Sequence, residues 1–406
     1  MKIKNIFFLI LSILTLINFI SNGIIKPAKP KNERGGGGYD FLVFYKAAQE
    51  ALSDKPNLYK EVMHRKTEYN YIPIVSYAFI PLTFFSEQNS IYVWLLINVI
   101  LAVASYFLLT RICGIVFQNK FYLLNYLILF NFNPLHETLK WGQVNVVVFF
   151  LILCCLYFCL KRNYITSGAF LGLSIILKIL PAVFIFYFLI TKKFKLAVYA
   201  CFAVLLIFLI SISVFGYKTH YKYFTEKIPA TAGLGYKGNI YDQSFQGLCF
   251  RFFWSGNDYV EPFFDNLKFA KICSFTLRLL CFAVLAFVLT RYIKGPPSNI
   301  KILLGFSITA AGMHLFHSLT WEHHLTWSVI LFVSVFAVII QNKLNRFYLY
   351  AALISYLTVA LKYGYDNKFF TQGIFILFTG IKLYGIIIIW ITGILLLKNN
   401  KINFSG

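Results

Sequence analysis

Long apolar runs separated by short basic connections dominate the chain. The apolar runs lie at 5–25, 72–86, 90–110, 121–133, 143–160, 165–190, 196–215, 268–291, 300–318, 324–340, 346–361 and 376–397. A membrane-spanning helix needs about 20 predominantly apolar residues, and repeated runs near this length are typical of helical membrane proteins. The pattern therefore predicts an all-α polytopic membrane protein.

The basic connections predict the orientation of these helices. Lys and Arg concentrate at Arg111–Lys120, Lys161–Arg162, Lys192–Lys195, Arg291–Lys301, Lys343–Arg346 and the tail after Lys398. Short loops rich in Lys and Arg stay on the cytoplasmic side. Together they predict about twelve crossings with both ends of the chain inside, and two long extracytoplasmic segments, 26–89 and 216–267.

Two runs need special treatment under this orientation. The run 72–86 contains Pro73 and Pro81, and we expect it to lie at the outer membrane face or to dip into it. The run 165–190 is expected to cross twice, with a break near Lys178 and Pro181, because broken helices are tolerated where they line a water-filled cavity. One tilted helix is the alternative. We expect 5–25 to be a retained helix, because no small-x-small cleavage site follows it.

Composition supports this class and excludes others. Of the 406 residues, 59% are hydrophobic and 13% are charged, whereas soluble domains carry about 25% charged residues. The net charge of +23 falls largely in the short connections, which favours a role in topology over one in binding an anionic partner. No basic face interleaved with aromatic residues is present, so nucleic-acid binding is excluded. The eight Cys form no CxxC pair, and we expect free thiols. Residues 1–406 are predicted to form a single membrane domain.

The first outer segment contains a candidate general base. Gly35–Gly38 precede Asp40, and we expect the glycines to form a flexible hinge before a helix that has Asp40 in its first turn. A carboxylate that is partly removed from water at the membrane surface has a raised pKa, as a general base at neutral pH requires. Capping of the helix is the alternative role for this residue.

Polar residues inside apolar runs supply further candidates. Gln143 and Asn145 follow Trp141-Gly142 and enter a run of Val and Phe, so they are expected to face a cavity or another helix, with interfacial anchoring as the alternative. Lys178 lies within an apolar helix, where a charge costs about 2.5–3.5 kcal/mol. It is expected either to bind a lipid phosphate or to snorkel to the interface.

The later outer segments carry basic and imidazole groups. Arg251 follows a polar stretch at 238–247, and it could clamp a phosphate or order its loop by pairing with Asp242 or Glu261. Four of the seven His lie within residues 314–324. Because the HExxH spacing of zinc enzymes is absent, no metal site is predicted. For these histidines, a role as hydrogen-bond donor to a phosphate or as proton shuttle is favoured. Interfacial packing is the alternative for His314 and His317.

Several short motifs occur in a fixed order along residues 39–324, about 70% of the chain. They are Tyr39-Asp40-Phe41-x3-Tyr45 with Leu58-Tyr59, Tyr71-x-Pro73-x7-Pro81-Leu82, Trp141-Gly142-Gln143-x-Asn145, Gly168-x3-Gly172-x5-Lys178-x2-Pro181, Asp242-Gln243-Ser244 before Arg251, and Trp321-Glu322-His323-His324. The ordered set resembles glycosyltransferase family 87 of the GT-C superfold. That family comprises polytopic transferases, including mannosyltransferases, that use polyprenyl-phosphate sugars.

The resemblance implies an activity and roles for particular residues. It implies inverting transfer of a hexose from a polyprenyl phosphate to a lipid or glycan acceptor, at the outer face of a bacterial inner membrane and without a metal or another cofactor. Asp40 would be the catalytic base, and His323 or His324 would act from a late helix. Lys178 and Arg251 would bind the donor phosphate. Substrate-binding roles fall to Gln143, Asn145, Asp242, Gln243, Trp321 and Glu322. The family often has Asn where this chain has Asp242.

Two other functions are compatible with the composition. One is a transporter or flippase of polyprenyl-linked sugars or lipids, although the inverted repeats and midplane sites of many transporters are not evident here. The other is a polymerase or ligase of surface polysaccharide, which would share the lipid-phosphate donor. Replacement of Asp40 by Asn separates transferase from carrier, because a carrier needs no base.

Overall fold

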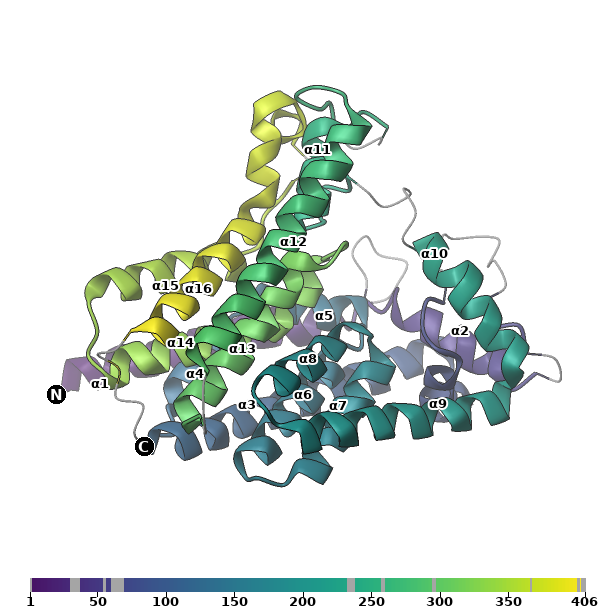
Figure 1. Cartoon of the computed structure of the whole chain (residues 1–406), viewed down its shortest axis with the longest axis horizontal. Helices are drawn as coiled ribbons and strands as arrows, with labels where there is room; N and C mark the ends of the chain where they lie inside the picture. Colours follow the sequence, from purple (N-terminus) through teal and green to yellow (C-terminus); the bar gives the residue numbers. More distant parts are fainter. Residues whose placement is uncertain are drawn as a thin grey trace. The chain divides into compact units, whose positions relative to one another are not determined.

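The fold is that of a computed structural model that describes residues 2–29, 37–53, 56–59, 69–231, 238–256, 260–293, 297–365, 367–399 and 402. Most of these residues are helical, and none of them lies in a β-strand (Figure 1). Isolated bridges join Asp242 to Trp321 and Glu261 to Gln372. The predicted all-α class is confirmed.

The α-helices follow the apolar runs, with additional short helices in the outer segments. They are α1 (Lys2–Phe19), α2 (Phe41–Ala51), α3 (Glu87–Phe117), α4 (Tyr122–Phe130), α5 (Asn133–Trp141), α6 (Asn145–Leu160), α7 (Tyr164–Leu177), α8 (Val183–Ile190), α9 (Phe194–Lys222), α10 (Ile228–Thr231), α11 (Phe245–Phe253), α12 (Leu267–Tyr292), α13 (Asn299–Phe316), α14 (Val329–Gln341), α15 (Arg346–Ala360) and α16 (Ile381–Lys398).

Tighter and wider helical turns connect or extend them. The π-helical turns are η1 (Ile20–Ile25) and η4 (Tyr223–Lys227), and the 3₁₀ segments are η2 (Pro73–Phe84), η3 (Leu180–Ala182), η6 (Glu322–Ser328), η7 (Lys368–Thr371) and η8 (Gly373–Gly380).

The chain divides into two compact units that alternate along the sequence. The first unit comprises Met1–Phe107, Leu135–Ala182 and Lys195–Gly233, and the second comprises Leu108–Pro134, Val183–Phe194 and Leu234–Gly406. Helices α3 and α5 continue from one unit into the other. The prediction of a single membrane domain is not tested by this division and stays a prediction.

Close helix packing in the first unit explains one motif. A Cβ added at Gly168 would lie 2.6 Å from the Cβ of Tyr199, and one added at Gly172 would lie 2.6 Å from the Cβ of Ala203. Small residues four apart let two helix backbones approach closely, as is common inside membranes. The Gly168-x3-Gly172 motif therefore permits the contact between α7 and α9.

The predicted break in the run 165–190 is confirmed. Helix α7 ends at Leu177, and Lys178 has an extended backbone with φ −149° and ψ 132°. The 3₁₀ turn η3 then contains Pro181, and α8 follows. Pro181 has no N–H to donate to the carbonyl four residues earlier, at Leu177, so a regular α-helix cannot continue through this point.

The second unit is built around α13 and α14. Nearly every described side chain of these two helices is buried, and the Ser307 and Ser334 hydroxyls are 2.9 Å apart between them. Trp390 of α16 donates an indole hydrogen bond of 3.1 Å to the Ile308 carbonyl. Helices α15 and α16 run side by side (Figure 1). These contacts fix the elements that carry the polar residues of this unit.

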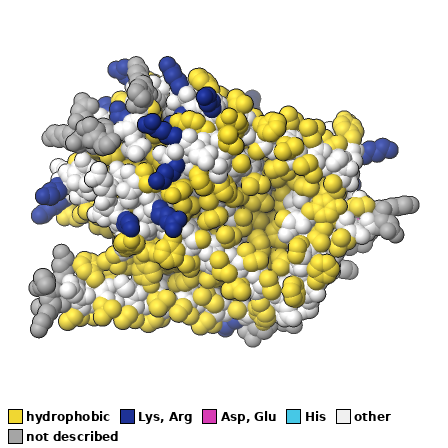
Figure 2. All heavy atoms as spheres, turned by 90° about the horizontal axis from the view of Figure 1, so that it is seen from below, with side chains coloured by type: hydrophobic (Ala, Val, Ile, Leu, Met, Phe, Trp, Pro, Cys, Tyr) yellow, Lys and Arg dark blue, Asp and Glu magenta, His cyan; other side chains and the backbone are white. Residues whose placement is uncertain are grey.

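Helix lengths identify a multi-pass membrane protein. Among the described residues, seven helices are long and apolar enough to cross a membrane: Asn5–Ile25, Glu87–Phe117, Phe194–Lys227, Leu267–Tyr292, Asn299–Phe316, Glu322–Gln341 and Gly373–Lys398. The other five predicted crossings are shorter helices, and α4 has 9 residues. Figure 2 shows a face on which hydrophobic side chains predominate and Lys and Arg gather in groups. The count of twelve crossings and the orientation stay predictions.

Candidate active site

Asp40 stands at the start of α2, but its carboxylate does not cap that helix. The residue is at the N-cap position with φ −77° and ψ −26°, and its side chain accepts no capping hydrogen bond. It is partly buried. The capping role that the sequence left open therefore does not describe the contacts of this side chain.

Backbone contacts hold the segment before Asp40 against the end of α5. The Gly38 amide donates to the Lys140 carbonyl at 2.8 Å, and the Asp40 amide donates to the Trp141 carbonyl at 2.9 Å. A Cβ on Gly38 would lie 2.9 Å from Ile91 side-chain atoms, and one on Gly37 would collide with the Pro27 carbonyl. Gly37 and Gly38 therefore pack closely against neighbouring segments, Gly35 and Gly36 lie outside the described residues, and the expected flexible hinge stays a prediction.

Gly142 allows the two segments to meet. Its φ is +69°, a conformation that glycine adopts without steric cost. A Cβ at this position would lie 2.7 Å from the Cβ of Phe41, and the Gly142 carbonyl accepts an indole hydrogen bond of 2.8 Å from Trp94. The Trp141-Gly142-Gln143 motif thus places the Gln143 side chain beside the first turn of α2.

Gln143 links Asp40 to a tyrosine. Its amide nitrogen Nε2 donates to Asp40 Oδ2 at 2.7 Å, and its Oε1 accepts from the Tyr71 hydroxyl at 3.2 Å. These residues lie up to 103 positions apart in the sequence. The structure therefore brings together the predicted residues Asp40 and Gln143.

The surroundings of Asp40 suit a proton acceptor. Burial raises the pKa of Asp40 above its usual value, and the hydrogen bond from Gln143 and the positive charge of Lys178 partly offset this rise. Burial, together with the nearby Asp40 charge, also raises the pKa of Tyr71, which keeps that hydroxyl protonated as a donor. A base whose pKa lies closer to neutral has more driving force for proton abstraction than an ordinary carboxylate.

Other polar residues near this point of the first unit are buried or partly buried. Asn145 begins α6 and is fully buried, and His136 is buried with its ring 6.1 Å from that of Phe19. Glu137 Oε2 accepts a hydrogen bond of 3.0 Å from the Trp141 indole. A substrate-binding role for Asn145 stays a prediction.

In the second unit, Asp242 organises a buried junction. Its Oδ1 accepts from the Ser244 amide at 3.0 Å and from the Thr320 amide at 2.9 Å, and its Oδ2 accepts from the Ser244 hydroxyl at 3.1 Å. Burial raises the pKa of Asp242 to about 6, although the Arg251 charge and these hydrogen bonds act in the opposite direction. Asp242 therefore ties the start of α11 to the segment before η6.

Gln243 and Arg251 complete this junction. The Gln243 amide donates to the Thr320 carbonyl at 2.7 Å, and its side chain donates to the Thr379 carbonyl at 2.9 Å. Arg251 is fully buried, and its Nη1 donates to the carbonyls of Asn239 and Asp242 at 2.5 and 2.8 Å. These contacts fit the loop-ordering alternative, and phosphate binding by Arg251 stays a prediction.

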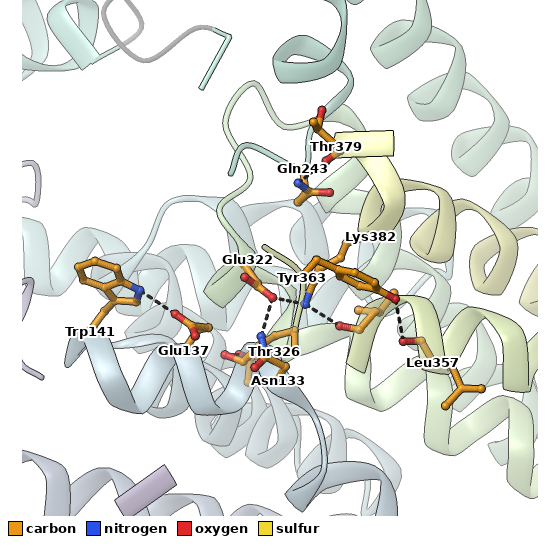
Figure 3. A network of polar contacts seen from close by, with 12 residues as sticks. Asn133, Glu137, Trp141, Gln243, Glu322, Thr326, Leu357, Tyr363, Thr379 and Lys382 are labelled. Carbon is orange, nitrogen blue, oxygen red and sulfur yellow. Dashed lines mark hydrogen bonds and ion pairs between the residues drawn. The ribbon is translucent and has the colours of Figure 1, made fainter. Parts of the chain in front are cut away.

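Glu322 lies in a second network of this unit (Figure 3). It forms an ion pair with Lys382, and its Oε1 also accepts from Asn133 Nδ2 at 2.6 Å. Lys382 is fully buried and donates to the Val359 carbonyl at 3.0 Å. The network joins η6 to α5, α15 and α16, so it fixes the residues that follow Glu322.

The histidines of this unit have distinct surroundings. The Trp321 amide donates to His324 Nδ1 at 3.3 Å, which leaves the proton of a neutral ring on Nε2. The rings of His323 and His324 are 4.6 Å apart and nearly perpendicular, and His314 is buried 5.7 Å from the Trp327 ring. Within the described part of the chain, no three His, Cys, Asp or Glu residues are grouped so as to hold a metal ion.

Sequence reasoning missed three residues of these networks as individual candidates. Tyr71 was noted only as part of a motif. Lys382 lies in the apolar run 376–397, where its charge was a signal of the same kind as that of Lys178. Asn133 carries no sequence signal, because its partner Glu322 lies 189 residues away.

Comparisons with known proteins support the resemblance to glycosyltransferase family 87. The profile described as Glycosyltransferase family 87 matches residues 69–317. A polyprenol-phosphate-mannose-dependent alpha-(1-2)-phosphatidylinositol pentamannoside mannosyltransferase from Mycolicibacterium smegmatis is 26% identical over 302 residues, which cover 72% of this chain and 68% of the relative.

A second relative is a polyprenol-phosphate-mannose-dependent alpha-(1-2)-phosphatidylinositol mannoside mannosyltransferase from Mycobacterium tuberculosis. It is 24% identical over 194 residues, which cover 48% of this chain and 41% of the relative. No solved structure matches the chain. The profile match covers more than half of the sequence and includes the Trp141-Gly142-Gln143 and Asp242-Gln243-Ser244 motifs. The chain therefore belongs to glycosyltransferase family 87.

Proposed function

We propose that this membrane glycosyltransferase moves a hexose, of the mannose class, from a polyprenyl-phosphate donor to a lipid or glycan acceptor. The family supports sugar transfer, and the names of both relatives specify a polyprenol-phosphate-mannose donor and a phosphatidylinositol mannoside acceptor. The acceptor of this chain is proposed only as a lipid or glycan. The same names give no support to the flippase alternative.

The observation that carries the proposal is the Asp40 carboxylate. It is partly buried, its Oδ2 is held by Gln143, and Oδ1 accepts no hydrogen bond from the described residues. Oδ1 can therefore take the proton of an acceptor hydroxyl while that oxygen attacks the anomeric carbon. The bond from this carbon to the phosphate oxygen breaks as the new glycosidic bond forms, so one base is enough and the configuration inverts.

The leaving polyprenyl phosphate gains negative charge as this bond breaks. Cationic or donor groups that stabilise developing charge lower the barrier. Lys178 acts electrostatically on Asp40 and is the first candidate in this unit. The roles of His323, His324 and Arg251 toward a donor phosphate stay predictions, and Arg251 orders the loop that contains Asp242.

The proposed location follows from charge and substrate. The donor's lipid tail requires the bilayer, and the basic connections are proposed to face the cytoplasm of a bacterial cell. Asp40 would then face the extracytoplasmic side of the inner, or plasma, membrane. Accessibility of a Cys introduced at Tyr39 to an impermeant reagent tests this orientation, and labelling only from the cytoplasmic side would contradict it.

Transfer in reconstituted membranes tests the activity. Three proteins are compared: wild type, Asp40→Asn and the control Glu226→Gln, which replaces an exposed carboxylate by an amide. Each receives radiolabelled polyprenyl-phosphate mannose with a native lipid extract. Glucose and arabinose donors follow. We expect Asp40→Asn to lose about 10²–10⁴-fold in rate while Glu226→Gln keeps it. Equal transfer by Asp40→Asn would remove Asp40 from the mechanism. Donor moved across the bilayer without transfer would favour a carrier.

A further inference from the structure

Tyr71, Gln143 and Asp40 form two hydrogen bonds in series, from hydroxyl to amide and from amide to carboxylate. We call this pair of hydrogen bonds the relay. We propose that Gln143 and Tyr71 are positioning residues that hold Asp40 Oδ2, so that Oδ1 is presented to the acceptor hydroxyl. This inference rests on the proposed function. It assigns to Gln143 a role toward the base rather than toward the sugar.

The chemistry of the groups fixes the direction of the relay. A carboxylate can only accept hydrogen bonds, so the atom of Gln143 beside Asp40 must be the amide nitrogen. The amide oxygen then points to Tyr71, whose hydroxyl must donate. Reversal of the amide would place two acceptors 2.7 Å apart and would leave the tyrosine hydroxyl without its acceptor. Tyr71 therefore holds the amide in the orientation that binds Asp40.

Both residues of the relay are themselves held in place. The backbone amide of Gln143 donates to the Thr138 carbonyl at 3.1 Å, directly after Gly142, which has a left-handed backbone conformation. The Tyr71 ring lies 4.6 Å from that of Phe44, and its carbonyl accepts from the Tyr59 hydroxyl at 2.9 Å. Groups that are fixed before substrate binds lose little entropy in the reaction, which is how positioning increases rate.

The position of Asp40 in the helix explains why such a device is needed. Asp is among the preferred N-cap residues, because its carboxylate can accept from the amides of the first helical turn. At the start of α2 this alternative is available, yet the carboxylate binds Gln143. Loss of the Gln143 amide would free the carboxylate to adopt other rotamers. The base would then leave its reactive position without a large loss of fold stability.

Loss of the relay also predicts a change in the pH profile. The groups that act on Asp40 are Gln143, Lys178 and Tyr71, and the Gln143 hydrogen bond favours the charged form. Removal of this bond raises the pKa of Asp40. Activity requires the deprotonated base, so the acid limb of kcat/KM should move to higher pH.

The test compares Gln143→Leu and Tyr71→Phe with the controls Gln49→Leu and Tyr92→Phe, which make the same changes at exposed positions. We expect Gln143→Leu to lower kcat by about 10²-fold, with little change in KM for the acceptor and no loss of melting temperature. Tyr71→Phe should lower kcat by about 2- to 10-fold, the equivalent of one net hydrogen bond. Both variants should shift the acid limb to higher pH, and the controls should not.

The outcomes separate the relay from the proposed function. If wild type transfers sugar and both variants keep kcat and the pH profile, the relay is wrong and the function stands. If wild type transfers no sugar from any donor, the proposed function fails and the relay fails with it. If Gln143→Leu does not fold, Tyr71→Phe decides, because the loss of one hydroxyl leaves the packing of its ring in place.

Discussion

Asp40 in the first unit and Asp242 in the second both stand beside a helix start, and both belong to short motifs. Their carboxylates have opposite surroundings. Asp40 is partly buried, and from the described residues its carboxylate accepts a single hydrogen bond, from Gln143. Asp242 is 1% exposed and accepts three, from the Ser244 amide, the Ser244 hydroxyl and the Thr320 amide.

This difference separates two uses of one residue type. A carboxylate whose acceptor capacity is largely occupied can order backbone segments, but it has little capacity left for a substrate proton. A carboxylate held by one oxygen keeps the other for chemistry. The comparison supports the proposed role of Asp40 as the base and a structural role for Asp242, although both residues lie in recognisable motifs of the sequence.

The Glu322 carboxylate, like that of Asp242, is occupied by contacts within the protein. Breaking its ion pair with Lys382 should lower the stability more than any change at Asp242. Lys382→Met leaves the Glu322 carboxylate, whose side chain is only 15% exposed, without its cationic partner, and breaking a buried ion pair typically costs about 3–5 kcal/mol. We expect the loss to appear as a lower melting temperature in detergent. The double variant Glu322→Gln with Lys382→Met should recover most of it, because Gln can still accept from Asn133. A double variant as unstable as the single one would contradict this account.

Asp242 offers the next test, through geometry rather than charge. Asp242→Ala leaves the buried amides of Ser244 and Thr320 without acceptors, at a cost of about 1–3 kcal/mol each. Asp242→Asn keeps an acceptor oxygen in the same place, so it should retain both stability and sugar transfer. Thermal melting and the transfer assay measure the two properties. Loss of transfer by a stable Asp242→Asn variant would show instead that its charge takes part in the reaction.

The pH dependence of stability should give the smallest effect. Because burial raises the pKa of Asp242 to about 6, its contribution is complete below about pH 4 and is lost as pH rises through 6. Asp242→Asn does not titrate. Relative to this variant, wild type should therefore melt at progressively lower temperature between pH 4 and 7. A constant difference across this range would mean that the carboxylate is not destabilised by burial.

The sequence by itself determined the class of the molecule and its family. The apolar runs are long and numerous enough to span a membrane repeatedly, so the helices and the multi-pass membrane class were predictable. The break at Lys178 and Pro181 was also predictable, because its cause is local to the backbone. The ordered motifs then indicated the family, because their residues and spacings can be read directly along the chain.

Only the tertiary structure decided which polar residues meet. The contacts Gln143 to Asp40 and Asn133 to Glu322 join residues 103 and 189 positions apart, and no helical or strand period encodes such pairs. The glycines before Asp40 also suggested a flexible backbone, whereas Gly38 packs closely against the Ile91 side chain. Burial and hydrogen bonding depend on neighbours from distant segments. For that reason the sequence could propose both Asp40 and Asp242 as functional residues but could not distinguish their roles.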